Sequence, residues 1–150
     1  MYSDIQTEQA VLACMLIDDN CSIDYGLLDV EDFTEETNKQ IFIAISNLVK
    51  QNKKVDYLTV YNFLNQKVEI SYLAGLSDSL PTTANLQQYV EQLKDLTLKR
   101  KLLKLADKIR DKDKSGQELA ELAERAIFEL RVETSLSEFT RLNELVLDVY

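Results

Sequence analysis

The sequence contains no histidine and no tryptophan, and its 150 residues include only three glycines and one proline. The absence of histidine excludes histidine general bases and histidine metal ligands. Because glycine occurs only at Gly26, Gly75 and Gly116, neither a phosphate-binding P-loop nor a dinucleotide-binding turn can form. The scarcity of glycine and proline favours helices over a turn-rich β fold. We therefore expect an all-α, non-catalytic chain without a metal or cofactor, which neither binds nor hydrolyses ATP.

Long apolar runs are also missing. No segment approaches the roughly 20 residues of a membrane span, and the N-terminal MYSDIQTEQ lacks the basic and apolar regions of a signal peptide. The 45% apolar and 29% charged content is typical of a soluble globular protein. The two cysteines, Cys14 and Cys21, suggest neither a metal site nor a disulfide framework. We expect a cytoplasmic protein with no membrane partner.

The stretch LQQYVEQLKDLTLKRKLLKLADKI, residues 86–109, predicts a long helix with two different apolar sides. Leu86, Tyr89, Leu93 and Leu96 form one stripe. At about 100° per residue, a second stripe is turned about 180° from the first. The second stripe consists of Leu98, Leu102, Leu105 and Ile109. We expect a helix that closes a globular core with its first half and packs on another element with its second half.

Apolar periodicity predicts the remaining helices. Before the long helix we expect a central helix from Ser3 or Asp4 and a short one near residues 22–28. An amphipathic helix capped by Thr34 or Thr37 follows, and then two short ones from Asp56 and Ile70, with a break at Pro81. After the long helix, a helix over about residues 117–131 folds back as a hairpin, and polar residues 133–135 precede a last short helix.

The expected organisation is a compact bundle of about six helices over residues 1–96, a hairpin over 97–133, and the start of a linker helix over 134–150. In the hairpin, Leu122, Ala126 and Leu130 can cover the second stripe. Phe128 lies opposite the stripe of its own helix and has no partner within the hairpin. We expect self-association through Phe128 and Leu130.

The net charge of −9 is unevenly placed. Residues 94–114 hold nine basic residues and four aspartates, a net charge of +5, which leaves −14 for the rest of the chain. Such asymmetry fits a DNA-binding arm, and it also fits the solvated side of an ordinary helix. A helical DNA-binding protein is therefore one alternative.

A second alternative, from the enzyme class, rests on four clustered carboxylates. Glu31, Asp32, Glu35 and Glu36 have the chemistry to bind a cation and assist hydrolysis. The same residues also fit the N-terminus of a helix, where negative charge is favourable. We prefer the structural interpretation.

Several segments, in order, resemble the N-terminal domain of DnaB-type replicative DNA helicases. The resemblance covers about residues 5–150. The segments are EQAVLACMLID, DF, QIFIAISNL, VDYLTV, SYLAGL, PTTANLQQYVEQL, KRKLLKLADKI and AERAIFEL. Two departures indicate a divergent member, for which a phage or a mobile element is an expected origin. Asn38 stands where the family commonly has histidine, and Val68-Glu69 stands where it usually has a glycine pair.

The resemblance implies the N-terminal collar of a hexameric ring helicase in the primosome, which docks the C-terminal domain of primase and also a helicase loader. The positions that match the family's primase-contacting residues are Tyr72, Leu103 and Ile109. The RecA-like motor of this family, which uses ATP and magnesium and contacts DNA, would follow Tyr150. We therefore expect no enzyme activity from this chain, whereas the full-length family member would be an ATP-dependent DNA helicase.

Overall fold

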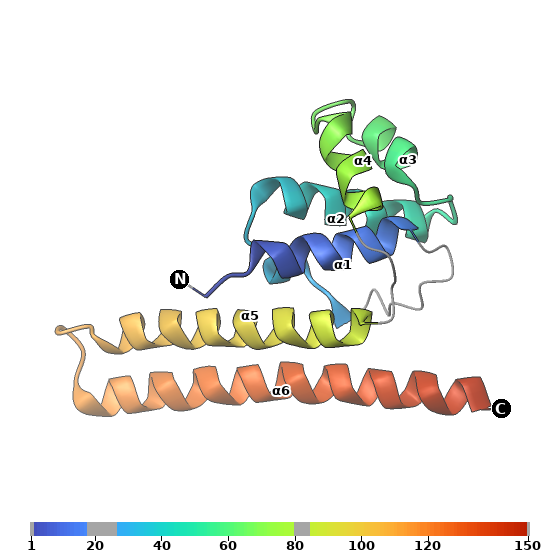
Figure 1. The fold of residues 1–150 in the computed structure, drawn as a ribbon. Helices are drawn as coiled ribbons and strands as arrows, with labels where there is room; N and C mark the ends of the chain where they lie inside the picture. The colour runs from blue at the N-terminus through green and yellow to red at the C-terminus, as the bar shows by residue number, and fades with distance from the viewer. Residues whose placement is uncertain (1, 18–26, 80–84, 150) are drawn as a thin grey trace. The chain divides into compact units, whose positions relative to one another are not determined.

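The structure is a computed structural model that describes residues 2–17, 27–79 and 85–149, with side chains up to Glu133. These residues form six α-helices and one short 3-10 helix, and they contain no strand (Figure 1). The elements are α1 (Ile5–Ile17), η2 (Val30–Asp32), α2 (Glu36–Lys50), α3 (Tyr57–Phe63), α4 (Ile70–Asp78), α5 (Leu86–Ile109) and α6 (Gly116–Val149). The expected all-α fold is confirmed. Within the described residues, no helix is long and apolar enough to cross a bilayer.

Some expectations fall outside the described residues. These are the short helix near residues 22–28, the break at Pro81 and the surroundings of Cys21. The apolar side chains expected in the last helix, beyond Glu133, are also outside the described set.

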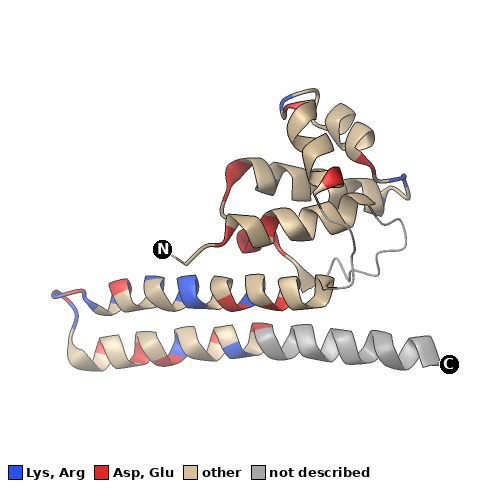
Figure 2. Cartoon of the chain, viewed as in Figure 1, with Lys and Arg blue, Asp and Glu red and all other residues tan. Residues whose placement is uncertain are grey.

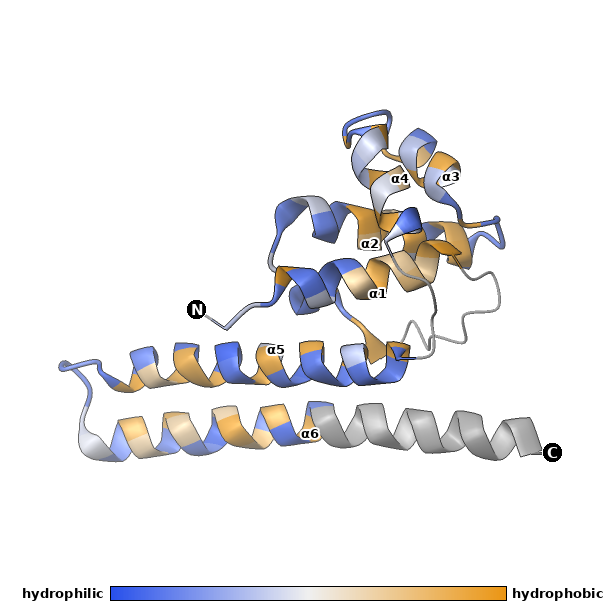
Figure 3. Cartoon of the chain, viewed as in Figure 1, coloured by the Kyte–Doolittle hydropathy of each residue, from blue (hydrophilic) through white to orange (hydrophobic). Residues whose placement is uncertain are grey.

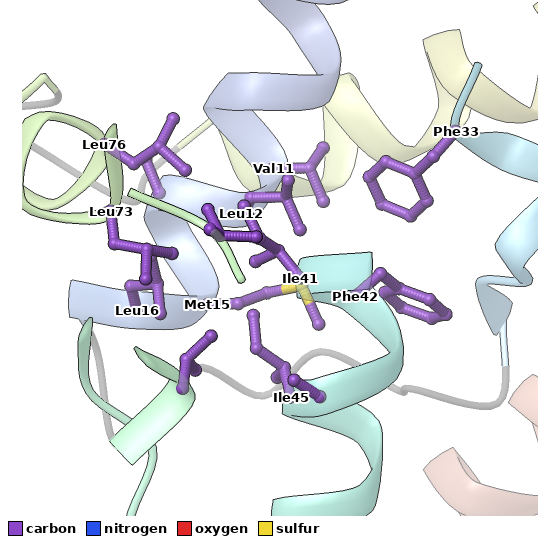
Figure 4. Packing of buried hydrophobic residues seen from close by; sticks show 14 of the residues in the cluster. Val11, Leu12, Met15, Leu16, Phe33, Ile41, Phe42, Ile45, Leu73 and Leu76 are labelled. Atoms are coloured by element: carbon purple, nitrogen blue, oxygen red, sulfur yellow. The ribbon is translucent and has the colours of Figure 1, made fainter. Parts of the chain in front are cut away.

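The chain divides into two compact units, Tyr2–Leu96 and Thr97–Tyr150. The first unit is a helical bundle around α1, whose residues 11–16 are all buried. A helix buried around its whole circumference occupies the centre of a core. Apolar side chains from α2, α3, α4 and the segment before α2 pack around it, as Figure 4 shows.

The helix α5 is uninterrupted from Leu86 to Ile109, as its composition predicts. Its first half completes the bundle core. Leu93 is fully buried there, and Leu86, Tyr89 and Val90 pack against the same cluster. The first stripe identified in the sequence therefore covers the bundle.

The second unit is a helical hairpin, in which the second half of α5 and α6 lie side by side and run antiparallel (Figure 1). Ser115 caps α6, because its side chain accepts a hydrogen bond from the Glu118 backbone N–H at 3.2 Å. The expected interruption at residues 133–135 was wrong, since α6 continues to Val149. Polar residues are ordinary on an exposed helix, and no glycine or proline follows Gly116 to end it. The assignment of residues 134–150 as a linker stays a prediction.

Two helices of the bundle end in left-handed turns built without glycine. Asn52 after α2 and Asn65 after α3 have φ of 55° and 52°. After α3, the Gln66 N–H bonds to the Tyr61 carbonyl at 3.2 Å and the Asn65 N–H to the Asn62 carbonyl at 3.1 Å, which is a Schellman ending. Asparagine tolerates the left-handed region because its short polar side chain can form a local hydrogen bond. Gln66 has φ of 64°, and its longer side chain does not offset the steric cost in this way.

Replacing Gln66 with glycine is expected to stabilise the protein by about 0.5–1 kcal/mol, because glycine adopts positive φ without steric cost. The urea midpoint should rise while the slope of the transition stays constant. Gln51→Gly is the matched control, since Gln51 has φ of −87° and should gain nothing. A Gln66→Gly variant no more stable than the wild type would show that this turn is not strained.

Candidate functional site: the bundle network and the surfaces of the hairpin

Tyr72, one of the three expected primase-contacting residues, lies on α4 and is half-buried against the bundle core. Its hydroxyl donates a hydrogen bond to Oδ1 of Asn38 at 2.6 Å and accepts one from Nε2 of Gln9 at 3.2 Å. The hydroxyl therefore links α4 to α1 and α2. The role of Tyr72 in primase docking stays a prediction. A partner would contact the part of the tyrosine ring that remains exposed.

The network continues from Asn38 to Glu8, whose carboxylate is buried in the bundle. Oε1 of Glu8 accepts hydrogen bonds from the Asn38 amide at 3.2 Å and from the backbone N–H groups of Thr34 at 3.0 Å and Glu35 at 3.3 Å. Oε2 accepts the Thr34 hydroxyl at 2.6 Å. Four donors thus converge on one carboxylate at the start of α2.

The expectation that Thr34 or Thr37 caps α2 was wrong. The N-cap residue is Glu35, whose side chain makes no capping hydrogen bond. Glu8 supplies the negative charge at this helix N-terminus from α1 instead, which satisfies both the helix dipole and the backbone donors.

The acidic cluster proposed for metal-assisted hydrolysis has a structural role at Asp32. Its buried carboxylate forms an ion pair with Nζ of Lys94 at 2.8 Å and accepts the Asp29 backbone N–H at 2.8 Å. Among the described residues, no three acidic or cysteine side chains are placed to hold a metal ion. Asp32 therefore anchors the first half of α5 to the bundle, and the described residues give the hydrolase alternative no support.

A second polar anchor joins α1 to α5. Asp4 accepts hydrogen bonds from the Thr7 hydroxyl at 2.7 Å and the Thr7 N–H at 3.1 Å, and Nε2 of Gln92 donates to it at 2.9 Å. The bond from the Thr7 hydroxyl is the main reason that the pKa of the Asp4 carboxyl lies below its ordinary value, and the Thr7 N–H adds to this effect. Asp4 is thus the cap that the sequence indicated for α1.

On the second half of α5, the stripe expected to be covered by α6 is only partly covered. Leu105 is buried, but Leu98, Leu102 and Ile109 remain exposed. Relative to Leu105, Leu102 lies about 60° and Ile109 about 40° to one side, whereas Lys101 lies about 40° to the other side. Nζ of Lys101 pairs with Glu133 of α6 at 3.2 Å, so α6 packs on the Lys101 side. The stripe is therefore turned partly away from α6.

On α6, the residues that face α5 are small or leucine, and Ile127 lies beside this row. The half-buried residues are Leu119, Leu122, Ala123, Ala126 and Leu130. Around the axis of α6, Ile127 lies about 100° from Ala126. Because α5 and α6 are antiparallel, this rotation places Ile127 on the same side of the hairpin as Leu102. Figure 3 shows apolar segments on both helices. We call Leu98, Leu102, Ile109 and Ile127, all 38–43% exposed, the apolar flank of the hairpin.

Leu103 lies on a different side of α5, about 160° from Leu105. It is 47% exposed, and Lys99, Arg100 and Lys104 are its neighbours in the sequence. Leu102, which the sequence pattern places on the face covered by the returning helix, is nearly as exposed, at 43%. Leu105 is the buried leucine of this half of α5.

Of the two residues expected in an oligomer interface, Phe128 is 67% exposed and points away from α5. Leu130 is half-buried on the row that faces α5. Both assignments stay predictions. The exposure of Leu98, Leu102 and Ile127 is not predictable from the sequence pattern, because helical periodicity gives a helix's apolar side but not the direction in which its neighbour packs.

The basic charge of α5 is balanced within the hairpin. Residues 97–114 carry eight basic and three acidic residues, whereas 116–133 carry two basic and five acidic ones. Figure 2 shows this contrast along the two helices. The Lys101–Glu133 ion pair joins them directly. This arrangement favours charge complementarity between the helices over an arm that binds DNA.

Comparison with known proteins identifies the family. The profile of the DnaB-like helicase N terminal domain matches residues 1–95. The replicative DNA helicase DnaB of Buchnera aphidicola is 29% identical in an alignment 141 residues long, which covers 85% of this chain and 30% of that protein. DnaB of Geobacillus stearothermophilus is 26% identical in an alignment 157 positions long, gaps included, which covers 97% of this chain and 35% of the relative. The chain thus spans about a third of the length of these curated relatives.

The fold has a counterpart among solved structures. The crystal structure of the N-terminal domain of DnaB helicase from Mycobacterium tuberculosis matches with a TM-score of 0.73 and 23% sequence identity. The match covers 85% of this chain and 97% of that one. Because the family profile covers more than half of the sequence, this chain belongs to the DnaB-like helicase N-terminal domain family.

Proposed function

We propose that this chain is the assembly and partner-docking domain of a replicative DNA helicase, a part of its N-terminal collar. The observation that carries this proposal is the apolar flank of the hairpin, to which both α5 and α6 contribute exposed leucine or isoleucine. Large apolar side chains gathered on one face of a soluble domain mark an interaction surface. The occupant that we propose is a second copy of the hairpin, because it brings a flank that is equally apolar.

The same proposal assigns ATP hydrolysis and strand separation to the part of the relatives that this chain does not span. The sequence lacks a P-loop, and the chain covers 30–35% of the helicases that it resembles. Hexameric ring formation would then arrange several motors around DNA, with the collar holding them together.

Primase docking is the second part of the proposal. Leu103 supports it, because an exposed leucine in a basic setting on the side of α5 turned away from α6 leaves room for a partner helix. Ile109 belongs to the apolar flank and Tyr72 to the bundle network, so we propose Leu103 as the main anchor for the C-terminal domain of primase. A helicase loader is a further partner of the same kind.

Two substitutions at adjacent positions test both parts. Leu102→Asp should reduce self-association at least about tenfold in sedimentation, because it places a charge in the apolar flank. Leu103→Asp should leave the mass unchanged but weaken binding of the cognate primase C-terminal domain by about 1–3 kcal/mol, as expected for an interface anchor.

Leu58→Asp is the matched control for primase binding, since Leu58 is equally exposed, at 48%, but lies on α3 of the bundle. It should change neither measurement. If Leu103→Asp binds primase as well as the wild type does, Leu103 is not the anchor. If the wild-type chain stays monomeric at high concentration, the proposed role of the apolar flank is wrong.

A further inference from the structure

One chain of hydrogen bonds connects the surface of the bundle with its interior. Tyr72 on α4 is half-buried, so part of its side chain is accessible, whereas Asn38 and Glu8 are only 0% and 1% exposed. The Tyr72 hydroxyl bonds to Oδ1 of Asn38, and the Asn38 amide bonds to Oε1 of Glu8. The buried carboxylate at the start of α2 is therefore two hydrogen bonds away from an accessible side chain.

The direction of each bond in this chain follows from Glu8. A carboxylate accepts hydrogen bonds and donates none. Asn38 must therefore turn its amide nitrogen toward Glu8, which leaves its oxygen facing Tyr72. Tyr72 must donate to that oxygen, and Gln9 in turn donates to the Tyr72 hydroxyl. Each group has one role, so a change at one end of the chain affects the next group.

Asn38 makes the two ends depend on each other, because it lies in the first turn of α2 and is fully buried. Without the Tyr72 hydroxyl, its oxygen would lack a donor, and an unsatisfied buried acceptor is unfavourable. Rotating the amide is no remedy, since it would turn the oxygen toward the Glu8 carboxylate. Asn38 reaches water only if the first turn of α2 opens, and this opening also separates the Thr34 and Glu35 N–H groups from Glu8.

We propose that Tyr72 is a latch on the start of α2. With the Tyr72 hydroxyl on Asn38, the cap that Glu8 provides is closed. Withdrawal of the hydroxyl opens residues 34–39 while the rest of the bundle stays folded. The inference concerns the bundle alone and does not depend on the docking surfaces proposed above.

The latch couples two places on the bundle. A contact that draws the Tyr72 ring outward favours the open cap, and a contact that holds the ring in place favours the closed one. By linkage, opening the cap weakens the placement of Tyr72 to the same extent. An event at α4 is thereby transmitted to the start of α2, and Asn38 and Glu8 are the positioning residues that transmit it.

Hydrogen exchange of the whole chain, followed amide by amide by NMR, tests the latch. Tyr72→Phe keeps the ring and removes only the hydroxyl. The amides of Thr34, Glu35 and Lys39 should then exchange at least about tenfold faster, because they report on the cap and the first turn of α2. Amides in the second half of α2 should change by less than about threefold.

Tyr61→Phe is the matched control, because Tyr61 is also half-buried against the core and its hydroxyl takes no part in this chain of hydrogen bonds. This variant should leave exchange at Thr34 and Glu35 unchanged. A double-variant cycle tests the route through the carboxylate. In a Glu8→Gln background the cap is already weakened, so adding Tyr72→Phe should accelerate the same two amides by less than about threefold.

Three results would overturn the latch. Equal acceleration of all bundle amides by Tyr72→Phe would mean that the hydroxyl contributes to overall stability alone. Unchanged exchange at Thr34 and Glu35 would mean that the cap does not depend on the hydroxyl. A full effect that persists in Glu8→Gln would mean that the hydroxyl acts on α2 without the carboxylate.

Discussion

Replacing Glu8 with alanine is expected to destabilise the bundle by about 3–5 kcal/mol. The buried carboxylate accepts four hydrogen bonds, from the Thr34 N–H and hydroxyl, the Glu35 N–H and the Asn38 amide. Alanine would leave these donors without their acceptor, at a site where Glu8 and Asn38 are both buried. The loss should appear in urea unfolding as a lower midpoint with an unchanged slope.

Two further variants serve as comparisons for Glu8→Ala. They are the conservative variant Glu8→Gln and the exposed control Glu91→Ala. Glutamine keeps the volume and one acceptor oxygen, so its cost should be less than half of that of alanine. Glu91 lies exposed on α5, and its loss should change stability by no more than about 0.5 kcal/mol. If Glu8→Ala is as stable as Glu91→Ala, the carboxylate does not organise the start of α2.

The second large effect is expected at Phe33, which is buried between η2 and α2. Its ring stacks on that of Phe42 with a centroid distance of 4.9 Å. Phe33→Ala would leave a cavity in the core and should cost about 3–5 kcal/mol in the free energy of unfolding. Phe33→Leu fills much of the volume and should cost about 1–1.5 kcal/mol.

Phe63→Ala is the matched control for this prediction. Phe63 ends α3 and is 37% exposed, so the same truncation removes less buried surface there. Denaturation of the three variants under one condition gives the comparison. Equal losses for Phe33→Ala and Phe63→Ala would show that the Phe33 site collapses around the smaller side chain.

The bounds of α5 were predictable because local features determine them. No glycine or proline interrupts residues 86–109, and the change of apolar side after Leu96 is visible in the spacing of the leucines. The all-α fold follows from the same kind of reasoning. Periodicity failed for the end of α6, because a polar stretch was interpreted as a break although nothing in it opposes a helix.

The contacts between elements were not predictable in the same way. Glu8 caps α2 across 26 residues of sequence, and Tyr72 reaches Asn38 across 34. Such pairings depend on how the helices of the bundle pack. The spacing of residues along a single sequence does not reveal that packing. The exposure of Leu102 has the same origin, since it depends on the angle at which α6 meets α5.

The charge distribution has a consequence for the solubility of an assembly. Tyr2–Leu96 holds six basic and fifteen acidic residues, so it carries the whole net charge of −9, whereas the unit from Thr97 onward is electrically neutral. If the chain assembles through its hairpins as proposed, two hairpins would approach without net repulsion, while the acidic bundles would repel each other and keep the assembled particles dispersed. Colloidal stability and specific association are thereby assigned to different parts of one small chain.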